Sequence, residues 1–285
     1  MTKYLIFGSA GFVGFNLKIE LERFVGNEVI GFDRRDPKKP RDILINKQEL
    51  YDEVENADIV FHLAAIPAHR LSVRNPEEIL QNNIECTLTI AEACRLHNKP
   101  MVYASSFSVY GNQPPSWTED MPMSAETPYS LSKVICEQIL QFYHKFYGLD
   151  VKIARFSNVY GPFEEFHDPM QVIPTWLNQA KKGEKITVYG ENTTRDFTYV
   201  FDICYGLMSI SRTPGFDIYN LCSGKEVKLL DIAKQITSNI QVLPLPSYET
   251  ERWVGDNSKI TKMGWQNTNN IDGWIWCEKL RRGIK

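Results

Sequence analysis

The sequence predicts an α/β fold, with a doubly wound parallel sheet followed by a smaller α/β domain. Three observations predict it. Short apolar runs alternate with longer amphipathic stretches over residues 1–157, the first run ends in a glycine-rich turn, and later runs end in small or hydroxyl-bearing residues. In such a sheet the ligand site lies beyond the carboxyl ends of the strands.

The first strand is expected over residues 3–7, and the turn after it places glycine at Gly8, Gly11 and Gly14. Glycine lets the backbone approach a pyrophosphate closely. An amphipathic stretch follows, and the N-terminus of that helix stabilises negative charge through its free amides and its dipole. The turn therefore predicts a pyrophosphate site.

The second strand, residues 28–33, ends at Asp33, nineteen residues after Gly14. A carboxylate at this place accepts hydrogen bonds from the adenosine ribose hydroxyls and repels a 2′-phosphate, which favours NAD over NADP. The adjacent Arg34 could hold a phosphate, so NADP stays open as the alternative.

The third strand, residues 57–65, ends in small residues that leave room for a flat cofactor. We interpret His62 as a hydrogen-bonded strand residue and not as a catalytic one. A helix over 76–97, which carries Asn83, leads to a fourth strand at 100–104.

The fourth strand is followed by Ser106, and a tyrosine and a lysine come later at Tyr129 and Lys133. Their spacing places both on the same face of a helix, which we expect over 128–147 with Pro128 at its start. An ammonium close to a phenol favours the phenolate, so such a tyrosine can act as a base near neutral pH. Alone, the pair is weak evidence, because this spacing occurs by chance in many helices.

After a fifth strand at 151–156 the organisation changes. A helix near 170–181 and a short strand at 186–189 are expected, and residues 195–202 return the chain to the first domain. The predicted division is a first domain of residues 1–157 with a returning segment near 197–213, and a discontinuous second domain within 158–285.

The composition, with 43% hydrophobic and 24% charged residues and a formal net charge of −3, is that of an ordinary globular protein. The basic cluster over 34–41 contains its own acid and prolines, so we interpret it as a solvated loop and expect neither nucleic acid nor membrane as a partner. The apolar run near the N-terminus is too short for a signal peptide, which predicts a cytoplasmic protein.

Six cysteines are scattered without Cys-x-x-Cys spacing: Cys86, Cys94, Cys136, Cys204, Cys222 and Cys277. We interpret them as reduced, buried thiols. No metal site is expected.

Together these features resemble the extended short-chain dehydrogenase/reductase family, specifically its nucleotide-sugar branch of epimerases, dehydratases, decarboxylases and 4-ketoreductases. The resemblance runs from Lys3 to about Trp265. Six segments stand in the family's order: Gly8-x-x-Gly11-x-x-Gly14, His62-Leu63-Ala64-Ala65, Ser105-Ser106 before Val109-Tyr110-Gly111, Tyr129-x-x-x-Lys133, Asn158-Val159-Tyr160-Gly161-Pro162 and Arg195-Asp196-Phe197.

The resemblance implies a Rossmann domain that binds NAD and a smaller domain that binds a nucleoside diphosphate sugar. Tyr129 would take the proton from a sugar hydroxyl while hydride passes to the nicotinamide. Lys133 would bond the nicotinamide ribose, and Ser106 would hydrogen-bond the reacting oxygen.

The cofactor-binding residues that the resemblance implies are Gly8, Gly11, Phe12, Val13, Gly14, Asp33, Arg34, Asp42, Ile43, Leu63, Ala64, Ala65, Asn83, Tyr129, Lys133 and Phe156. Its substrate-binding positions match Ser106, Asn158, Arg195 and Arg252. The Arg-Pro-Gly motif usual before the last of these is missing.

The residues between Ser106 and Val109 discriminate among the family's reactions. The hexose 4,6-dehydratases have an Asp-Glu pair there, and the decarboxylases and GDP-mannose dehydratases keep a glutamate, whereas this chain has Phe107 and Ser108. A C4 epimerase needs only Tyr129, Ser106, bound NAD and space for a 4-keto sugar to turn over, and it is the predicted function. A 4-ketoreductase with exchangeable NAD(P)H is the alternative, ahead of a 4,6-dehydratase and of a binding protein on the same fold.

A bulky residue three positions before Asp256, here Trp253, favours plain hexoses over N-acetylated ones in the 4-epimerases. The predicted substrate is therefore UDP-glucose or UDP-galactose, with UDP chosen on family frequency. Family members pair through the helices that correspond to 76–97 and 128–147, so a homodimer is expected.

Overall fold

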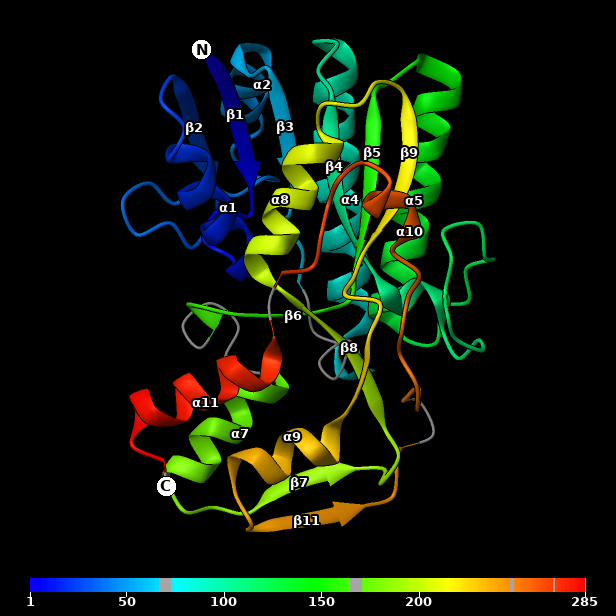
Figure 1. The fold of residues 1–285 in the computed structure, drawn as a ribbon. Helices are drawn as coiled ribbons and strands as arrows, with labels where there is room; N and C mark the ends of the chain where they lie inside the picture. The colour runs from blue at the N-terminus through cyan, green and yellow to red at the C-terminus, as the bar shows by residue number, and fades with distance from the viewer. Residues whose placement is uncertain (67–72, 165–170, 247–248, 269, 285) are drawn as a thin grey trace.

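The computed structural model describes residues 1–66, 73–164, 171–246, 249–268 and 270–284. Its centre is a parallel sheet with the strand order β2-β1-β3-β4-β5-β9 (Figure 1). The strands are β1 (Thr2–Phe7), β2 (Asn27–Phe32), β3 (Ile59–His62), β4 (Met101–Ser106), β5 (Val151–Phe156) and β9 (Phe216–Leu221). The order reverses between β1 and β3, so the predicted doubly wound sheet is confirmed, and its ligand crevice is expected at that point.

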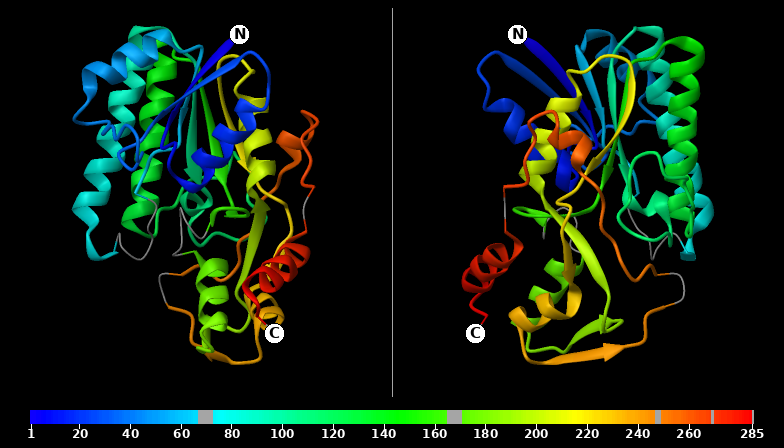
Figure 2. Two further views of the ribbon diagram at one scale, coloured as in Figure 1. Left: turned by 90° about the vertical axis from the view of Figure 1, so that its left-hand side faces the viewer. Right: turned by 45° about the vertical axis from the view of Figure 1, so that its right-hand side comes forward.

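Helices cover both faces of this sheet (Figure 2). One face carries α2 (Lys47–Asn56), α4 (Pro76–Leu96) and α5 (Pro128–Tyr147), and the other carries α1 (Phe12–Glu22) and α8 (Val200–Ile210). Side chains alternate along β1, so that Leu5 and Phe7 pack under the first group and Tyr4 and Ile6 under the second. The two apolar cores therefore hold the strand ends, where the predicted site lies, in place.

Helix α5 begins at Pro128 because the preceding residues cap it. The side chains of Thr127 and Ser130 each accept a hydrogen bond from the other's backbone N–H, at 3.2 and 2.9 Å. Proline at the first position has no N–H to satisfy. Gly148 ends the helix with a φ of 74°. The predicted helix over 128–147 is confirmed, and α4 ends one residue before the predicted 97.

A smaller set of elements lies below the sheet in Figure 1, with its own core around Trp176, Ile232 and Ile275. It contains β6 (Asn158–Tyr160), α7 (Val172–Lys181), β7 (Ile186–Tyr189), β8 (Thr194–Tyr199), β10 (Glu226–Lys228), α9 (Leu229–Ile236), β11 (Ile240–Leu243) and α11 (Ile271–Arg282). The strands form the sheets β10-β8-β6 and β11-β7. The helix expected near 170–181 begins at Val172, and residue 170 lies outside the described residues.

The chain returns to the large sheet over a longer stretch than 197–213. After α8, strand β9 pairs with β5 in parallel, and later α10 (Ser258–Thr261) and Trp265 join the core on the α1 face. The sequence analysis missed β9, because a six-residue run that contains Asp217 and Asn220 does not reveal which sheet it will join.

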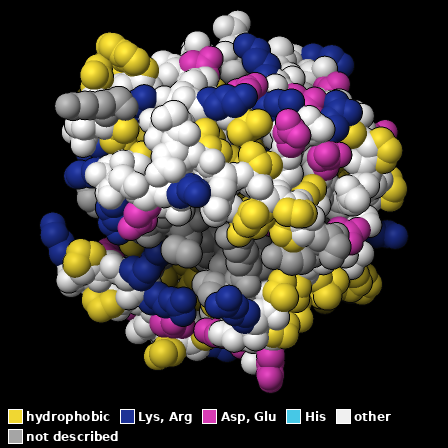
Figure 3. Space-filling model, turned by 90° about the horizontal axis from the view of Figure 1, so that it is seen from below, with side chains coloured by type: hydrophobic (Ala, Val, Ile, Leu, Met, Phe, Trp, Pro, Cys, Tyr) yellow, Lys and Arg dark blue, Asp and Glu magenta, His cyan; other side chains and the backbone are white. Residues whose placement is uncertain are grey.

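One cysteine departs from its predicted burial. Cys277 is exposed and not buried as expected, because the buried face of α11 is formed by Ile271, Ile275 and Glu278; all six cysteines are free thiols. On the face seen from below, acidic and basic side chains both occur (Figure 3). No helix in the described part of the chain is long and apolar enough to cross a membrane.

Candidate active site

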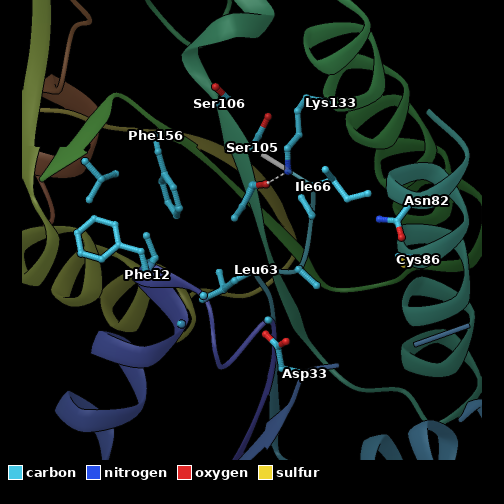
Figure 4. Close-up of a pocket in the computed structure, with 18 of the residues that line it drawn as sticks. Phe12, Asp33, Leu63, Ile66, Asn82, Cys86, Ser105, Ser106, Lys133 and Phe156 are labelled. Atoms are coloured by element: carbon cyan, nitrogen blue, oxygen red, sulfur yellow. Dashed lines mark hydrogen bonds between the residues drawn. The ribbon is translucent and has the colours of Figure 1, made fainter. Parts of the chain in front are cut away.

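A cavity of about 360 Å³ opens at the carboxyl ends of the strands, next to the reversal between β1 and β3. Asp33 lies at one end of it, and Ser106 and Lys133 lie at the other (Figure 4). Asn158 and Trp253 add to its wall from the segments that follow the sheet. The cavity thus joins the two groups of residues that the sequence singled out.

The glycine turn after β1 packs so closely against neighbouring backbone that Gly8 and Gly14 have no room for a side chain. Gly8 has a φ of +88°, and a Cβ there would lie 2.6 Å from the backbone nitrogen of Ala64. A Cβ at Gly14 would lie 2.2 Å from the carbonyl oxygen of Gly8. This packing brings the N-terminus of α1, at Phe12, to the cavity, and a helix N-terminus is a favourable place for a pyrophosphate.

Asp33 follows β2 and is held by backbone amides. It is 7% exposed, and its carboxylate accepts hydrogen bonds from the N–H groups of Ala10 and Arg35, at 3.0 and 2.8 Å. Arg34, Arg35 and Arg41 line the same end of the cavity, the first two exposed and the third buried. Arg35 and Arg41 are not among the predicted cofactor-binding residues, because charge composition does not show which side chains of a loop the fold brings to a cavity.

All but one of the predicted cofactor-binding residues line the cavity. They are Gly8, Gly11, Phe12, Val13, Gly14, Asp33, Arg34, Asp42, Ile43, Leu63, Ala64, Ala65, Tyr129, Lys133 and Phe156. The exception, Asn83, lies behind the wall, where its amide donates to Ser132 Oγ at 3.0 Å and accepts from the Ile66 N–H at 2.9 Å. Its place in the wall is taken by Asn82 and Cys86, because these residues occupy the adjacent face of α4.

Tyr129 and Lys133 lie one turn apart on α5 and line the same end of the cavity as Ser106. Lys133 Nζ donates to the carbonyl oxygen of Ala104 at 2.7 Å. It lies 4.7 Å from the ring centroid of Tyr103 and 5.9 Å from that of Tyr129. Burial lowers the pKa of Lys133 to about 8. The ammonium and the phenol ring therefore lie on the same side of α5 and at the same end of the cavity, and the pairing of the ammonium with the phenolate stays a prediction.

The hydroxyl of Ser106 is oriented by the turn η1 (Phe107–Tyr110) that follows β4. Its Oγ accepts a hydrogen bond from the backbone N–H of Ser108 at 3.2 Å. Phe107 is fully buried and packs on Trp117, with 5.7 Å between the ring centroids. Both residues between Ser106 and Val109 are therefore buried, and neither brings a charge to the cavity.

The two arginines predicted to bind substrate, Arg195 and Arg252, are not among the residues that line the cavity in the described part of the chain. Arg195 is 9% exposed, and its Nη2 lies 3.2 Å from Glu249 Oε2; burial lowers its pKa to about 10, against the effect of that carboxylate. Arg252 is exposed and contacts both carboxylate oxygens of Glu226 at 2.8 Å. No sequence motif marked the two glutamates, which pair with both arginines in this structure; contact of the arginines with a substrate stays a prediction.

Other lining residues were not among the predicted site residues. Ser105 and Val159 stand in the quoted family segments without an assigned role, and the rest carried no motif: Phe32, Ile66, Ala104, Ser157 and Gln171. His62 is buried outside the cavity, with its Nε2 2.9 Å from Thr87 Oγ1, and burial lowers its pKa to about 3. This agrees with its interpretation as a hydrogen-bonded strand residue. In the described ranges, no group of His, Cys, Asp and Glu could hold a metal ion.

Comparisons with known proteins agree with this geometry. The sequence profile of the NAD dependent epimerase/dehydratase family matches residues 4–222. The UDP-glucuronate 4-epimerase of Thermodesulfobacterium geofontis is 31% identical over 250 residues, which cover 79% of this chain and 76% of that protein. The UDP-N-acetyl-alpha-D-glucosaminuronate decarboxylase of Bacillus cytotoxicus is 30% identical over 251 residues, which cover 81% and 78%.

The same architecture occurs in solved structures. The UDP-glucuronic acid 4-epimerase from Bacillus cereus, crystallised with UDP-glucuronic acid and NAD, superposes with a TM-score of 0.89 at 25% identity over 99% of each chain. The shared fold extends over both the large sheet and the smaller domain.

Proposed function

The chain belongs to the NAD-dependent epimerase/dehydratase family, and we propose that it epimerises a nucleotide sugar at C4, with a UDP-hexose as substrate. NAD is the cofactor of this family. One observation carries the proposal: Ser106, Tyr129 and Lys133 come together at one end of the cavity, and the carboxylates that line the cavity in the described residues are at the other.

Those carboxylates are Asp33 and Asp42, and both belong to the segment after β2. Between the positions of Ser106 and Val109, the related dehydratases and decarboxylases carry an acidic residue. This chain has the buried Phe107 and Ser108 there. Elimination of water needs a further acid and base next to the sugar. Epimerisation does not, because the proton returns to the same oxygen and the hydride returns to the same carbon, C4, on its opposite face.

The chain's own residues can perform the proton transfers. Ser106 would hold O4 of the sugar by a hydrogen bond, and Tyr129 would take the proton from that hydroxyl as the C4–H bond breaks. Lys133, held by the carbonyl of Ala104, would stabilise the phenolate. Bound NAD supplies the acceptor and then the donor of the C4 hydride. After the 4-keto sugar turns over, Tyr129 would return the proton to the same oxygen.

The residues present fit NAD along the whole cavity. The glycine turn at Gly8 and Gly14 leaves its backbone open to a pyrophosphate, Asp33 suits the adenosine ribose, and Lys133 suits the nicotinamide ribose. The small residues after β3 leave room for the rings between these points.

The substrate's diphosphate would require the arginines to exchange partners. Arg195 and Arg252 pair with Glu249 and Glu226, and a guanidinium fork matches a phosphate as well as a carboxylate. Trp253, which lines the cavity, would border the sugar and favour a plain hexose over an N-acetylated one.

A nucleotide 4-keto-sugar reductase is the second candidate. It would use Ser106, Tyr129 and Lys133 once, with exchangeable NADH or NADPH. The exposed Arg34 and Arg35 at the Asp33 end of the cavity favour it, because either guanidinium could contact a 2′-phosphate.

Proton NMR of the purified protein with UDP-, dTDP- and GDP-sugars, without added nicotinamide, separates the two. Conversion of one sugar to its C4 epimer is expected, and equal or faster turnover of UDP-N-acetylglucosamine would refute the preference for a plain hexose. If no sugar is converted but NADH or NADPH is consumed with a 4-keto sugar, the protein is the reductase.

The proposal includes a homodimer in a reducing, cytoplasmic environment. Exposed apolar side chains gather on α4 and α5, which pack against each other: Leu88, Leu96, Leu131, Phe142, Phe146 and Tyr147. A second copy would cover them. The six free thiols support the reducing environment. Light scattering that finds a monomer at micromolar concentration would contradict the dimer.

A further inference from the structure

Behind the wall that carries Ser106 and Lys133 lies an almost completely buried ion pair, Glu137 on α5 with Arg155 on β5. Each side chain is 2% exposed. Arg155 Nη2 lies 2.7 Å from Glu137 Oε2, and Arg155 Nε lies 3.0 Å from Glu137 Oε1, so the two groups meet as a fork. Neither side chain lines the cavity.

Glu137 connects the catalytic helix to the catalytic strand. Its carboxylate accepts a hydrogen bond from Ser105 Oγ, and Ser105 immediately precedes Ser106. Along α5, Glu137 comes four residues after Lys133 and eight after Tyr129, on the same side of the helix. One carboxylate therefore joins the helix that carries the phenol to the strand that carries the hydroxyl.

Arg155 connects the same carboxylate to the turn that orients Ser106. Its Nη1 donates to Tyr110 Oη at 2.9 Å, and Tyr110 is the last residue of η1. Tyr110 Oη in turn donates to Asn220 Oδ1 on β9 at 2.6 Å. Arg155 thus fixes the position of η1 from behind, on the side away from the cavity.

We propose that Glu137 and Arg155 are a positioning pair, whose buried fork sets the separation between the Ser106 hydroxyl and the Tyr129 phenol. The assignment rests on the proposed function, because it concerns the same reaction centre. A buried ion pair adds little stability, since the cost of desolvating two charges offsets most of their attraction. It does fix the direction of each hydrogen bond, and here the bonds converge on α5, β4 and η1.

Glu137 also acts on the charge of Lys133. Burial lowers the pKa of Lys133, and the neighbouring Cys136 and then Glu137, one helical turn away, oppose that effect. The titratable groups that face the ammonium are Tyr129, Cys136 and Glu137 on α5, Tyr103 on β4 and His62 on β3. Without the carboxylate, the ammonium would lose its proton at lower pH.

The test uses the full chain with the substitutions Glu137→Gln and Arg155→Met, the double substitution Glu137→Met/Arg155→Met, and Lys152→Met as a matched control. Lys152 is also a buried cation on β5, 2% exposed and paired with Asp150, but it lies near the amino end of the strand, away from the cavity. Steady-state kinetics with the sugar identified by NMR, and melting temperatures, are measured for each.

Each single substitution is expected to lower kcat about tenfold to a hundredfold while KM changes less than about threefold, because misplacement acts on the reacting atoms and not on binding. The double substitution should regain melting temperature, since no charge remains buried alone, and yet keep the low kcat. Lys152→Met should lower the melting temperature only. Recovery of kcat in the double variant, or wild-type kcat in the single variants, would make the pair merely structural.

A readout without substrate separates this proposal from the proposed function. In NMR spectra of ¹³C-lysine-labelled protein, the signal lost in Lys133→Met belongs to Lys133, and its titration midpoint should be about 8. We expect a lower midpoint in Glu137→Gln and an unchanged one in Lys152→Met. If the wild-type protein converts no sugar, the proposed function fails, and an unchanged Lys133 midpoint in Glu137→Gln then overturns the positioning pair as well.

Discussion

The two ends of the cavity are built in different ways. The Asp33 end is built from the backbone: the glycine turn packs against Ala64, just after the end of β3, and the amides of Ala10 and Arg35 hold the carboxylate. At the Ser106 end the groups are side chains from segments far apart in sequence, Ser106, Tyr129, Asn158 and Trp253, and behind Trp253 lies Arg195, paired with Glu249 at a separation of 54 residues. The first end is held by the backbone, whereas under the proposed function the arginines near the second would exchange ionic partners when an anionic ligand binds.

The largest expected effect lies at the Ser106 end. Tyr129→Phe should leave the fold and NAD binding unchanged but reduce kcat about a thousandfold, because the phenol is the proposed base. Tyr143→Phe, on the same helix, is the control and should behave as wild type. Unchanged turnover in Tyr129→Phe would remove this tyrosine from the chemistry.

Arginine substitutions near the Ser106 end test the proposed exchange of partners. Arg195→Met should weaken UDP binding, measured by calorimetry, by about thirtyfold, and Arg252→Met by about threefold, since a buried guanidinium contributes more than an exposed one. Glu249→Gln should strengthen UDP binding, because it releases Arg195. If Glu249→Gln weakens binding, the ion pair is part of the site and not a competitor for it.

Asp33→Ala tests the end held by the backbone. The substitution should weaken NAD binding by about tenfold and NADP binding by less, since the carboxylate accepts hydrogen bonds from the ribose hydroxyls of NAD but repels a 2′-phosphate. Asp36→Ala, in the same loop but outside the cavity wall, is the control. Equal weakening of both cofactors would defeat the argument for NAD.

The two ends should also respond differently to pH. As the pH rises through about 8, Lys133 loses its proton, so kcat should fall about tenfold per unit above that value. Cofactor affinity at the Asp33 end should change little, because that end is built from the glycine turn and from backbone amides, which do not titrate in this range. Measurement of kcat and of the Kd for NAD from about pH 6 to about pH 9 checks both; a kcat that stays level to pH 9 would show that the charge of Lys133 is not needed.

The contrast also explains what the sequence could and could not predict. The turn at Gly8, the helix that begins at Pro128 and the approach of Lys133 to Tyr129 depend on residues within a few positions of one another, so local rules sufficed. Asn83 was placed in the wall instead of Asn82, because one step along a helix turns a side chain by about 100° and the pattern does not fix the helix rotation that closely.

Long-range pairing accounts for the other misses. Glu249 and Glu226 form ion pairs with Arg195 and Arg252, the arginines at substrate-binding positions of the family. Only the fold brings each pair together. The fork between Glu137 and Arg155 joins residues 18 positions apart on different elements, and neither carries a signal of its own in the sequence. Strand β9 was missed for the same reason, since its partner β5 lies some sixty residues earlier.

The late arrival of β9 has a consequence for synthesis of the chain. When residues 1–157 have left the ribosome, β5 is the edge of a five-stranded sheet, and its apolar run has unpaired backbone groups. It stays so until about sixty more residues, including most of the small domain's first half, have been made. A nascent chain or a truncated fragment that stops at residue 157 therefore exposes β5 as an unpaired edge strand, which is prone to aggregation. The segment of the small domain that lies between β5 and β9 delays completion of the large sheet.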